Sequence, residues 1–354
     1  MWQWTSMIVM ASKEWRTGAE PYNDRAGVGD MAVRRGDRPV VETLAPGHLS
    51  RPAVYALLVL VTLILGLNWP IMATGVVAIP PVWMGVFRAG GALLVLLPLT
   101  MATGNFRVPP RADLPIVASL AVIKLALVFF LVFTGLRLVP PGRSSVIVWT
   151  ASLWTVPIAA VVLGERMVGR RWLGLTLGIC GVIVLFEPWG LAWDEPGVAV
   201  GHALLILAAI LNAATAVHIR AHRWTISPLQ AVPWQLGGAV VVLAILALAI
   251  EGAPHIDWTP QLGWIVAYQG ILASGIAFWA QIVVLRNLAA ISANLTLMMV
   301  PVVGVLSSAV LVHEVITPTL VTGLLLIMTG VTLNLLADQS ERITLPPAET
   351  PTQP

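Results

Sequence analysis

Two basic residues lie inside long apolar segments of this sequence. Arg88 falls in the segment 82–100, and Lys124 falls close to the middle of the segment 113–136. On membrane-insertion scales, a charged residue near the centre of a helix costs about 2.5–3.5 kcal/mol, so another interaction must offset that free energy. A buried cation can bind a carboxylate or a phosphate, and a desolvated lysine can also release a proton. We therefore predict that Arg88 and Lys124 bind a substrate.

Each of these cations also has a structural interpretation. Lys124 can donate hydrogen bonds to backbone carbonyl groups at a break in its helix. Arg88 lies near the outer end of its segment, from where a long side chain can extend toward the membrane surface. No Asp or Glu lies in the interior of an apolar segment, so the expected partner of Lys124 is an external anion, water or the backbone.

Uncharged polar and aromatic residues in or beside the apolar segments complete a predicted pocket. Indole and phenol rings combine a flat apolar surface with one hydrogen-bond donor. Amide side chains can both donate and accept. Taken singly, each such residue is more typical of helix packing or of a membrane interface. The candidates are Asn68, Trp69, Trp149, Trp154, Asn212, Gln235, Tyr268, Gln269, Trp279, Gln281 and Asn294.

Several catalytic chemistries find no support in the sequence. No Walker-type phosphate loop occurs, and His313-Glu314 is not followed by the second His that a zinc protease helix needs. An aspartyl intramembrane protease needs two Asp in facing helices, and a serine hydrolase of the Gly-x-Ser-x-Gly type needs that stretch; no apolar segment interior holds either. We expect no enzyme, no metal or organic cofactor, and no nucleic-acid partner, because no basic face is present.

The elements that carry these residues are predicted to be membrane-spanning helices. Only 10% of the 354 residues are charged and 58% are apolar, which leaves too few charges to cover a surface in water. Apolar runs of about 20 residues recur, the length of a helix that crosses a ~30 Å hydrocarbon core. The alternating pattern of a membrane barrel is not seen. The ten predicted spans are 53–73, 82–100, 113–136, 144–163, 171–187, 199–219, 229–250, 262–285, 289–312 and 318–337.

The two ends of the chain differ from the apolar middle. Residues 1–51 contain seven Lys/Arg and six Asp/Glu and predict a disordered cytoplasmic tail, with Met31 as an alternative start. Residues 338–354 predict a short polar tail. With the N-terminus inside, nine Arg lie in inner connections and the C-terminal tail against two in outer connections, as the positive-inside rule requires. We expect a multi-pass protein of the inner (cytoplasmic) membrane with both termini in the cytoplasm.

An internal repeat predicts how the ten spans are arranged. At an offset of 149 or 147 residues, equal residue types align in the pairs Phe129–Phe278, Glu165–Glu314, Gly174–Gly323, Gly90–Gly237 and Gly91–Gly238, and Arg88 aligns with Gln235. The halves 52–187 and 199–337 each hold five spans. Because five is odd, the second half must enter the membrane upside down. Inverted repeats place a substrate site near the membrane midplane, between the halves.

Short motifs give the chain a resemblance to a known family. They are LGLNW at 65–69, FR at 87–88, VWTASLW at 148–154, LGER at 163–166, MMVP at 298–301 and HE at 313–314. On these motifs the chain resembles the drug/metabolite transporter superfamily, EamA type, over about residues 53–337. The resemblance implies an all-α membrane protein of two five-helix halves that transports metabolites, with Arg88 in a gating or positioning role. Three positions depart from the family pattern, namely Lys124, Ser152 and His313.

Three motif residues are interpreted as architecture rather than chemistry. Glu165 and Glu314 lie at the ends of the fourth and ninth spans, and Pro301 lies within the ninth. A carboxylate at such a position can cap a helix or form a salt bridge across a short turn. For Glu165 both interpretations stay open, and Arg166 and Arg170 are the candidate partners of a salt bridge.

The sequence therefore predicts a secondary transporter that moves small polar or amphipathic metabolites by alternating access, through proton-coupled export or exchange. Because basic groups lie at membrane depth without acidic ones, we expect a substrate that bears a carboxylate or a phosphate. A channel or a lipid flippase with the same helices is the alternative, and an intramembrane enzyme is the least favoured. The pattern predicts no oligomeric state.

Overall fold

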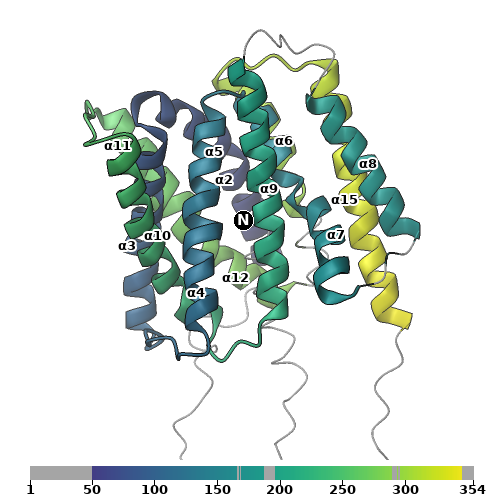
Figure 1. The fold of residues 1–354 in the computed structure, drawn as a ribbon, viewed down its shortest axis with the longest axis horizontal. Coiled ribbons are helices and arrows are strands. Elements are labelled where there is room, and N and C mark those ends of the chain that lie inside the picture. Colours follow the sequence, from purple (N-terminus) through teal and green to yellow (C-terminus); the bar gives the residue numbers. More distant parts are fainter. Residues whose placement is uncertain are drawn as a thin grey trace, which may run out of the picture.

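The computed structural model describes residues 50–165, 167, 169–186, 196–288, 293 and 296–344. Nearly all of the predicted N-terminal tail and the last ten residues lie outside this part. The described residues form helices joined by short connections (Figure 1). The helices are α2 (Arg51–Ala78), α3 (Pro81–Ala102), α4 (Leu114–Ser119), η2 (Leu120–Leu127), α5 (Val128–Leu136), α6 (Pro141–Trp149), α7 (Ala151–Leu163), α8 (Gly169–Phe186), α9 (Pro196–Ala221), α10 (Pro228–Ile250), α11 (Pro260–Ala267), η3 (Tyr268–Ile276), α12 (Ala277–Asn287), α14 (Val300–Leu311) and α15 (Pro318–Thr344).

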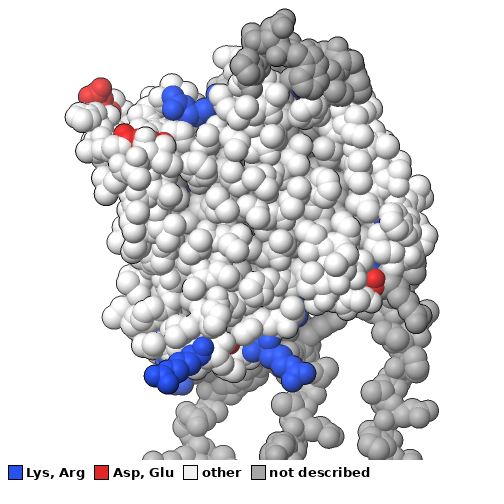
Figure 2. All heavy atoms as spheres, in the orientation of Figure 1, with Lys and Arg blue, Asp and Glu red and all other residues white. Residues whose placement is uncertain are grey.

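The prediction of an all-α membrane protein is confirmed. Within the described residues, nine helical segments are long and apolar enough to cross a membrane, and each corresponds to a predicted span. The tenth predicted span, 289–312, contains the shorter apolar helix α14, and residues 289–292 and 294–295 lie outside the described part. Large apolar side chains such as Val77 and Val161 are more than 80% exposed, which suits contact with lipid. Charged side chains gather mainly near the two ends of the molecule (Figure 2).

The packing of the helices has the symmetry of the repeat. Helix α3 packs against η3, and its counterpart α10 packs against η2. Helix α2 packs against α14, and its counterpart α9 packs against α6 and α7. The pairs α3–α10 and α8–α15 join counterparts directly, and α8 and α15 lie side by side at one edge (Figure 1). Exchanging the corresponding helices leaves this pattern unchanged, so the halves interlock around a pseudo-two-fold axis.

Glycine permits a close crossing of α3 and η3. A methyl group on Gly91 would lie 2.7 Å from the Cα of Gly270, so the two backbones touch. The equivalent crossing of α10 and η2 is also close, because a methyl group on Gly238 would lie 2.9 Å from the Cβ of Ala121. Small residues at such crossings allow helices in lipid to pack closely. The repeated glycines therefore mark the contacts that hold the two halves together.

The helices are interrupted at corresponding places in the two halves. The third span passes through the π-helix η2, and the eighth span passes through the π-helix η3. The fourth span breaks at Thr150, whose hydroxyl donates to the carbonyl of Ile147 (2.6 Å). The turn before α14 contains Met299, at the position that the repeat pairs with Thr150. Hydroxyl bonds to the preceding turn compete with the helical pattern and bend helices; the apolar pattern alone predicts unbroken spans here.

Glu165 joins three segments at one end of the molecule. Its carboxylate accepts a hydrogen bond from Arg171 (3.1 Å) and forms an ion pair with Arg220, at the end of α9. The candidate partners were Arg166, which lies outside the described residues, and Arg170. A salt bridge across the turn is present, but its partner is Arg171, whose side chain is buried, rather than Arg170. Helix α9 supplies a second partner 55 residues away.

Glu314 caps a helix of the other half. Its carboxylate accepts hydrogen bonds from the backbone N–H groups of Gly142 (2.7 Å) and Arg143 (3.1 Å), in the first turn of α6. The first N–H groups of a helix have no partner within it, and the helix dipole favours an anion there. The connection after α14 is thereby tied to the start of α6.

We expect this cap to make stability depend on pH. Burial raises the pKa of Glu314 above its ordinary value of 4.5, against the opposing effect of the two backbone hydrogen bonds and of the Arg143 charge. A raised folded-state pKa contributes stability that is complete below pH 4.5 and is lost as the pH rises through the folded pKa. The melting temperature of wild type relative to Glu314→Gln should therefore fall as the pH rises above 4.5. Thermal unfolding in detergent over a pH series measures this difference in melting temperature. A difference that stays constant with pH contradicts the prediction.

Candidate functional site

A cavity lies between the two halves of the molecule. The volume open to the centres of water-sized molecules is about 120 Å³. One water needs roughly 10–15 Å³ of such volume, so the cavity has room for a small metabolite. Its walls come from α2, α3, η2, α5, α6, α7, α9 and α14. The lining residues are Leu65, Asn68, Trp69, Met72, Arg88, Lys124, Leu125, Val128, Phe129, Val132, Phe133, Val148, Trp149, Ala151, Asn212 and Val300.

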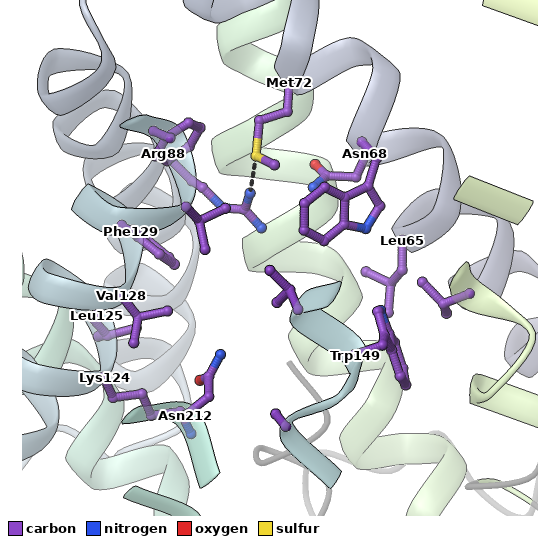
Figure 3. A pocket seen from close by; sticks show the side chains of 16 residues that line it. Leu65, Asn68, Met72, Arg88, Lys124, Leu125, Val128, Phe129, Trp149 and Asn212 are labelled. Carbon is purple, nitrogen blue, oxygen red and sulfur yellow. Dashed lines mark hydrogen bonds between the residues drawn. The ribbon is translucent and has the colours of Figure 1, made fainter. Parts of the chain in front are cut away.

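Six of the thirteen predicted substrate-binding residues line this cavity. They are Asn68, Trp69, Arg88, Lys124, Trp149 and Asn212. Figure 3 shows Arg88 reaching in from one side, with Lys124 and Asn212 at the other end and Asn68 and Trp149 across the space. The described lining residues include no Asp or Glu. The two ionisable side chains in the cavity wall, Arg88 and Lys124, are both basic.

Three of the predicted residues bind other parts of the protein and do not line the cavity. The hydroxyl of Tyr268 donates to the carbonyl of Ile64 (2.8 Å) and so ties η3 to α2. The indole N–H of Trp154 donates to the hydroxyl of Thr150 (3.2 Å), at the break in the fourth span. Trp279 packs against the largest hydrophobic core. These three side chains lie on helix faces that are turned toward neighbouring helices. The apolar pattern of the sequence did not predict this orientation.

Three further predicted residues have three different surroundings, and Gln269, the remaining one, contacts Arg88. Gln281 lines a second, smaller cavity beside the first. Gln235, the repeat partner of Arg88, is fully buried but lines neither cavity. Its amide has no hydrogen-bond partner in the part of the chain that the structure describes. Asn294 lies outside the described residues.

Arg88 is held in place by four neutral groups. Its Nη1 donates to Oε1 of Gln269 (3.0 Å) and to the sulfur of Met72 (3.3 Å), and its Nε donates to the hydroxyl of Ser274 (3.0 Å). The guanidinium carbon lies 5.1 Å from the centre of the Phe129 ring, a cation–π contact. No carboxylate contacts Arg88 in the described part of the chain. The guanidinium is therefore fixed in direction while its charge is left for another anion.

The π-helix η3 supplies two of these groups. The hydroxyl of Ser274 donates to the carbonyl of Gln269, five residues back (2.8 Å), and so bonds a carbonyl within the widened turn. Single π-helical turns are frequent at functional sites, and Lys124 lies in the equivalent π-helix η2. Met72, Phe129 and Ser274 were not among the predicted site residues. Of these three, only Phe129 had a signal in the sequence, its alignment with Phe278 in the repeat.

The chain matches a known family over both of its halves. The model of the EamA-like transporter family matches the chain twice, over residues 53–187 and 199–336. The chain belongs to this family. The prediction from the sequence motifs is thus confirmed, and the two matches correspond to the two five-helix halves.

Several proteins are similar to this EamA-like transporter over most of their length. "Uncharacterized transporter YoaV" of Bacillus subtilis is 27% identical over 77% of this chain and 94% of its own. "Probable amino-acid metabolite efflux pump" of Escherichia coli is 27% identical over 80% of this chain and 94% of its own. "Probable terminal-alkyne amino-acid exporter" of Streptantibioticus cattleyicolor is 28% identical over 75% of this chain and 92% of its own.

One solved crystal structure agrees in fold. It aligns with 84% of this chain and 100% of its own, with a TM-score of 0.57 and 18% sequence identity. With the family match, these comparisons make the protein a multi-pass transporter of the inner membrane that takes small molecules, and not an enzyme.

Proposed function

We propose that this transporter exports small carboxylate-bearing metabolites of the amino-acid class. The observation that carries the proposal is the pair of buried basic side chains, Arg88 and Lys124, in the wall of one cavity without an acidic lining residue. Charge in a site with few water molecules interacts strongly with an opposite charge, so the cavity favours an anionic group. One relative is named "Probable amino-acid metabolite efflux pump" and another "Probable terminal-alkyne amino-acid exporter". These names support both the substrate class and the outward direction.

The cavity also offers a group for the ammonium of an amino acid. The amide oxygen of Asn68 is buried and has no hydrogen-bond partner among the described residues, and Asn68 lines the cavity together with Arg88. Buried acceptors are nearly always bonded, so this oxygen is suited to a donor from the substrate. We assign the carboxylate to Arg88 and the ammonium to Asn68, with Lys124 adding to the positive field.

Alternating access is the mechanism that suits this architecture. Inverted repeats hold a substrate site between halves whose relative movement opens it first to one side and then to the other. The interlocked halves and the repeated breaks in the helices support such a movement, driven by protons or by exchange. Both termini lie in the cytoplasm in this proposal. A channel is less supported, because the cavity is small and lined by buried side chains.

Ligand-induced thermal stabilisation of the purified protein tests the proposal. A ligand that binds only the folded state raises the melting temperature by mass action. We expect amino acids to stabilise wild type, and we expect the matched amides, which lack the carboxylate, to have no effect. Lys124→Ala should weaken the stabilisation by amino acids. Equal stabilisation by acids and amides, in both proteins, contradicts the anion site, whereas saturable flux stimulated by substrate on the opposite side of a liposome separates a carrier from a channel.

Ser274 is expected to act as a positioning residue for Arg88. Ser274→Ala removes the acceptor of the Arg88 Nε–H, and a hydrogen bond to a charged group contributes ~1.5–3 kcal/mol. We therefore expect KM for amino acids to rise about tenfold, the low end of that range, with a smaller change in kcat. Ser274→Thr keeps the hydroxyl and should restore KM. Liposome uptake over a concentration series measures both constants, and an unchanged KM in Ser274→Ala rules out the role.

A further inference from the structure

A second cavity lies beside the first, between α3, η2, α5, α10, η3 and α12. The volume open to the centres of water-sized molecules is about 70 Å³, which corresponds to roughly five to seven such spheres. Residues that line this cavity alone include Ala92, Leu96, Val232, Leu236 and Phe278. A space of this size accommodates a group of up to about five to seven heavy atoms, since a methyl group and a water molecule are of similar size.

The chemistry of this second cavity is mostly apolar. Apart from the wall that it shares with the first cavity, its polar lining consists of Ser274, which already bonds Arg88, and Gln281. The side chain of Gln281 is 3% exposed, and its amide oxygen has no hydrogen-bond partner among the described residues. The cavity thus suits an uncharged group, and it offers one acceptor to a donor carried by that group.

The two cavities meet at Arg88. Arg88, Leu125 and Phe129 line both of them. A carboxylate bound to the guanidinium places the adjoining carbon atom of the ligand next to both spaces. One substituent of that carbon, the ammonium, has its acceptor Asn68 in the first cavity. The other substituent is then directed to the second cavity, past the ring of Phe129.

We propose that the second cavity is the side-chain subsite of the transporter, so that its substrates are α-amino acids with uncharged side chains of up to about five to seven heavy atoms. The proposal rests on the function proposed above and narrows it. The subsite excludes a cationic side chain because no Asp or Glu of the described protein lines it. It offers no further counter-charge to an acidic side chain, because the one charged residue in its described lining, Arg88, binds the substrate carboxylate. It excludes an indole because the space is too small. Gln281 favours side chains that carry a hydrogen-bond donor over hydrocarbon side chains of equal length.

Two substitutions that change the volume of the second cavity in opposite directions test the subsite. Val232→Phe fills the second cavity, and Leu236→Ala enlarges it; Val148→Phe, which fills the first cavity only, is the matched control. One methylene in a hydrophobic pocket changes discrimination about tenfold or more. We expect Val232→Phe to lower kcat/KM for leucine relative to alanine about tenfold, and Leu236→Ala to raise it for tryptophan relative to leucine by a similar factor. Val148→Phe should lower uptake of all three amino acids alike.

The measurement is uptake of radiolabelled alanine, leucine and tryptophan into liposomes that contain the full chain, with gel filtration to verify that each variant is folded. Gln281→Leu adds a further comparison and should lower uptake of glutamine relative to leucine. If Val232→Phe and Leu236→Ala both take up amino acids at the level of wild type, and with the same ratios of kcat/KM between alanine, leucine and tryptophan, the subsite is overturned but the proposed function is not. If liposomes that contain the wild-type protein take up none of the amino acids, the proposed function is overturned, and this inference with it.

Discussion

Arg88→Gln is expected to lower amino-acid transport about 100-fold and to leave the protein folded. Truncating one partner of a buried, hydrogen-bonded charge pair costs ~2–5 kcal/mol, and in this protein the lost partner is the anchor of the substrate carboxylate. The fold should survive, because a neutral side chain removes a buried charge whose insertion is unfavourable. Glutamine is also the residue that the repeat places at position 235.

The planar shape of the guanidinium group predicts that a lysine at position 88 supports less transport than arginine but more than glutamine. Arg88 uses Nε and Nη1 to bond Ser274, Gln269 and Met72, and a lysine cannot reproduce this planar set of donors. Arg88→Lys should therefore retain part of the transport, between wild type and Arg88→Gln. Gln235→Leu is the matched control, because it changes a buried polar residue at the equivalent position of the other half but outside both cavities.

Initial rates of amino-acid uptake into liposomes measure these effects, after gel filtration has established equal amounts of folded protein. Transport by Arg88→Gln at the level of wild type would remove Arg88 from the substrate site. A similar loss in Gln235→Leu would mean that buried polar groups matter for stability rather than for the substrate.

Alanine substitutions at the neighbouring glycines Gly90 and Gly91 should change the stability of the protein in opposite directions. At Gly91 the added methyl group would lie 2.7 Å from the Cα of Gly270, so α3 or η3 must move; overpacking of this kind costs ~1–3 kcal/mol. The movement also separates Arg88 from Gln269 and Ser274, so transport should fall as well. At Gly90 no atom lies within 4 Å of the added methyl group. Alanine is favoured over glycine in a helix by roughly 0.5–1 kcal/mol, so Gly90→Ala should be slightly more stable than wild type.

The second half of the chain provides an independent repetition of this experiment. A methyl group at Gly238 would meet the Cβ of Ala121 at 2.9 Å, whereas one at Gly237 would meet nothing within 4 Å. Thermal unfolding in detergent should rank Gly237→Ala above Gly238→Ala, just as it ranks Gly90→Ala above Gly91→Ala. Equal melting temperatures within each pair contradict the close crossings.

Much of this protein can be predicted from its sequence, because the relevant information is local along the chain. Each span is a run of apolar residues long enough for the membrane, and lipid forces such a run to satisfy its own backbone as a helix. The inverted arrangement follows from an odd number of spans in each half. The cations Arg88 and Lys124 stand out because charge in an apolar run requires an explanation.

The tertiary structure alone decides which polar side chains meet. Tyr268 and Gln269 are neighbours and both donate to backbone carbonyls of α2, yet of the two only Gln269 also accepts a hydrogen bond from Arg88. The π-helix η3 adds to this, because a wider turn shifts every later side chain relative to the regular helical period. Arg88 and Gln235 occupy equivalent positions in the repeat but have different surroundings. Side-chain direction depends on the rotation of each helix about its axis, which is set by packing against helices far away in the chain.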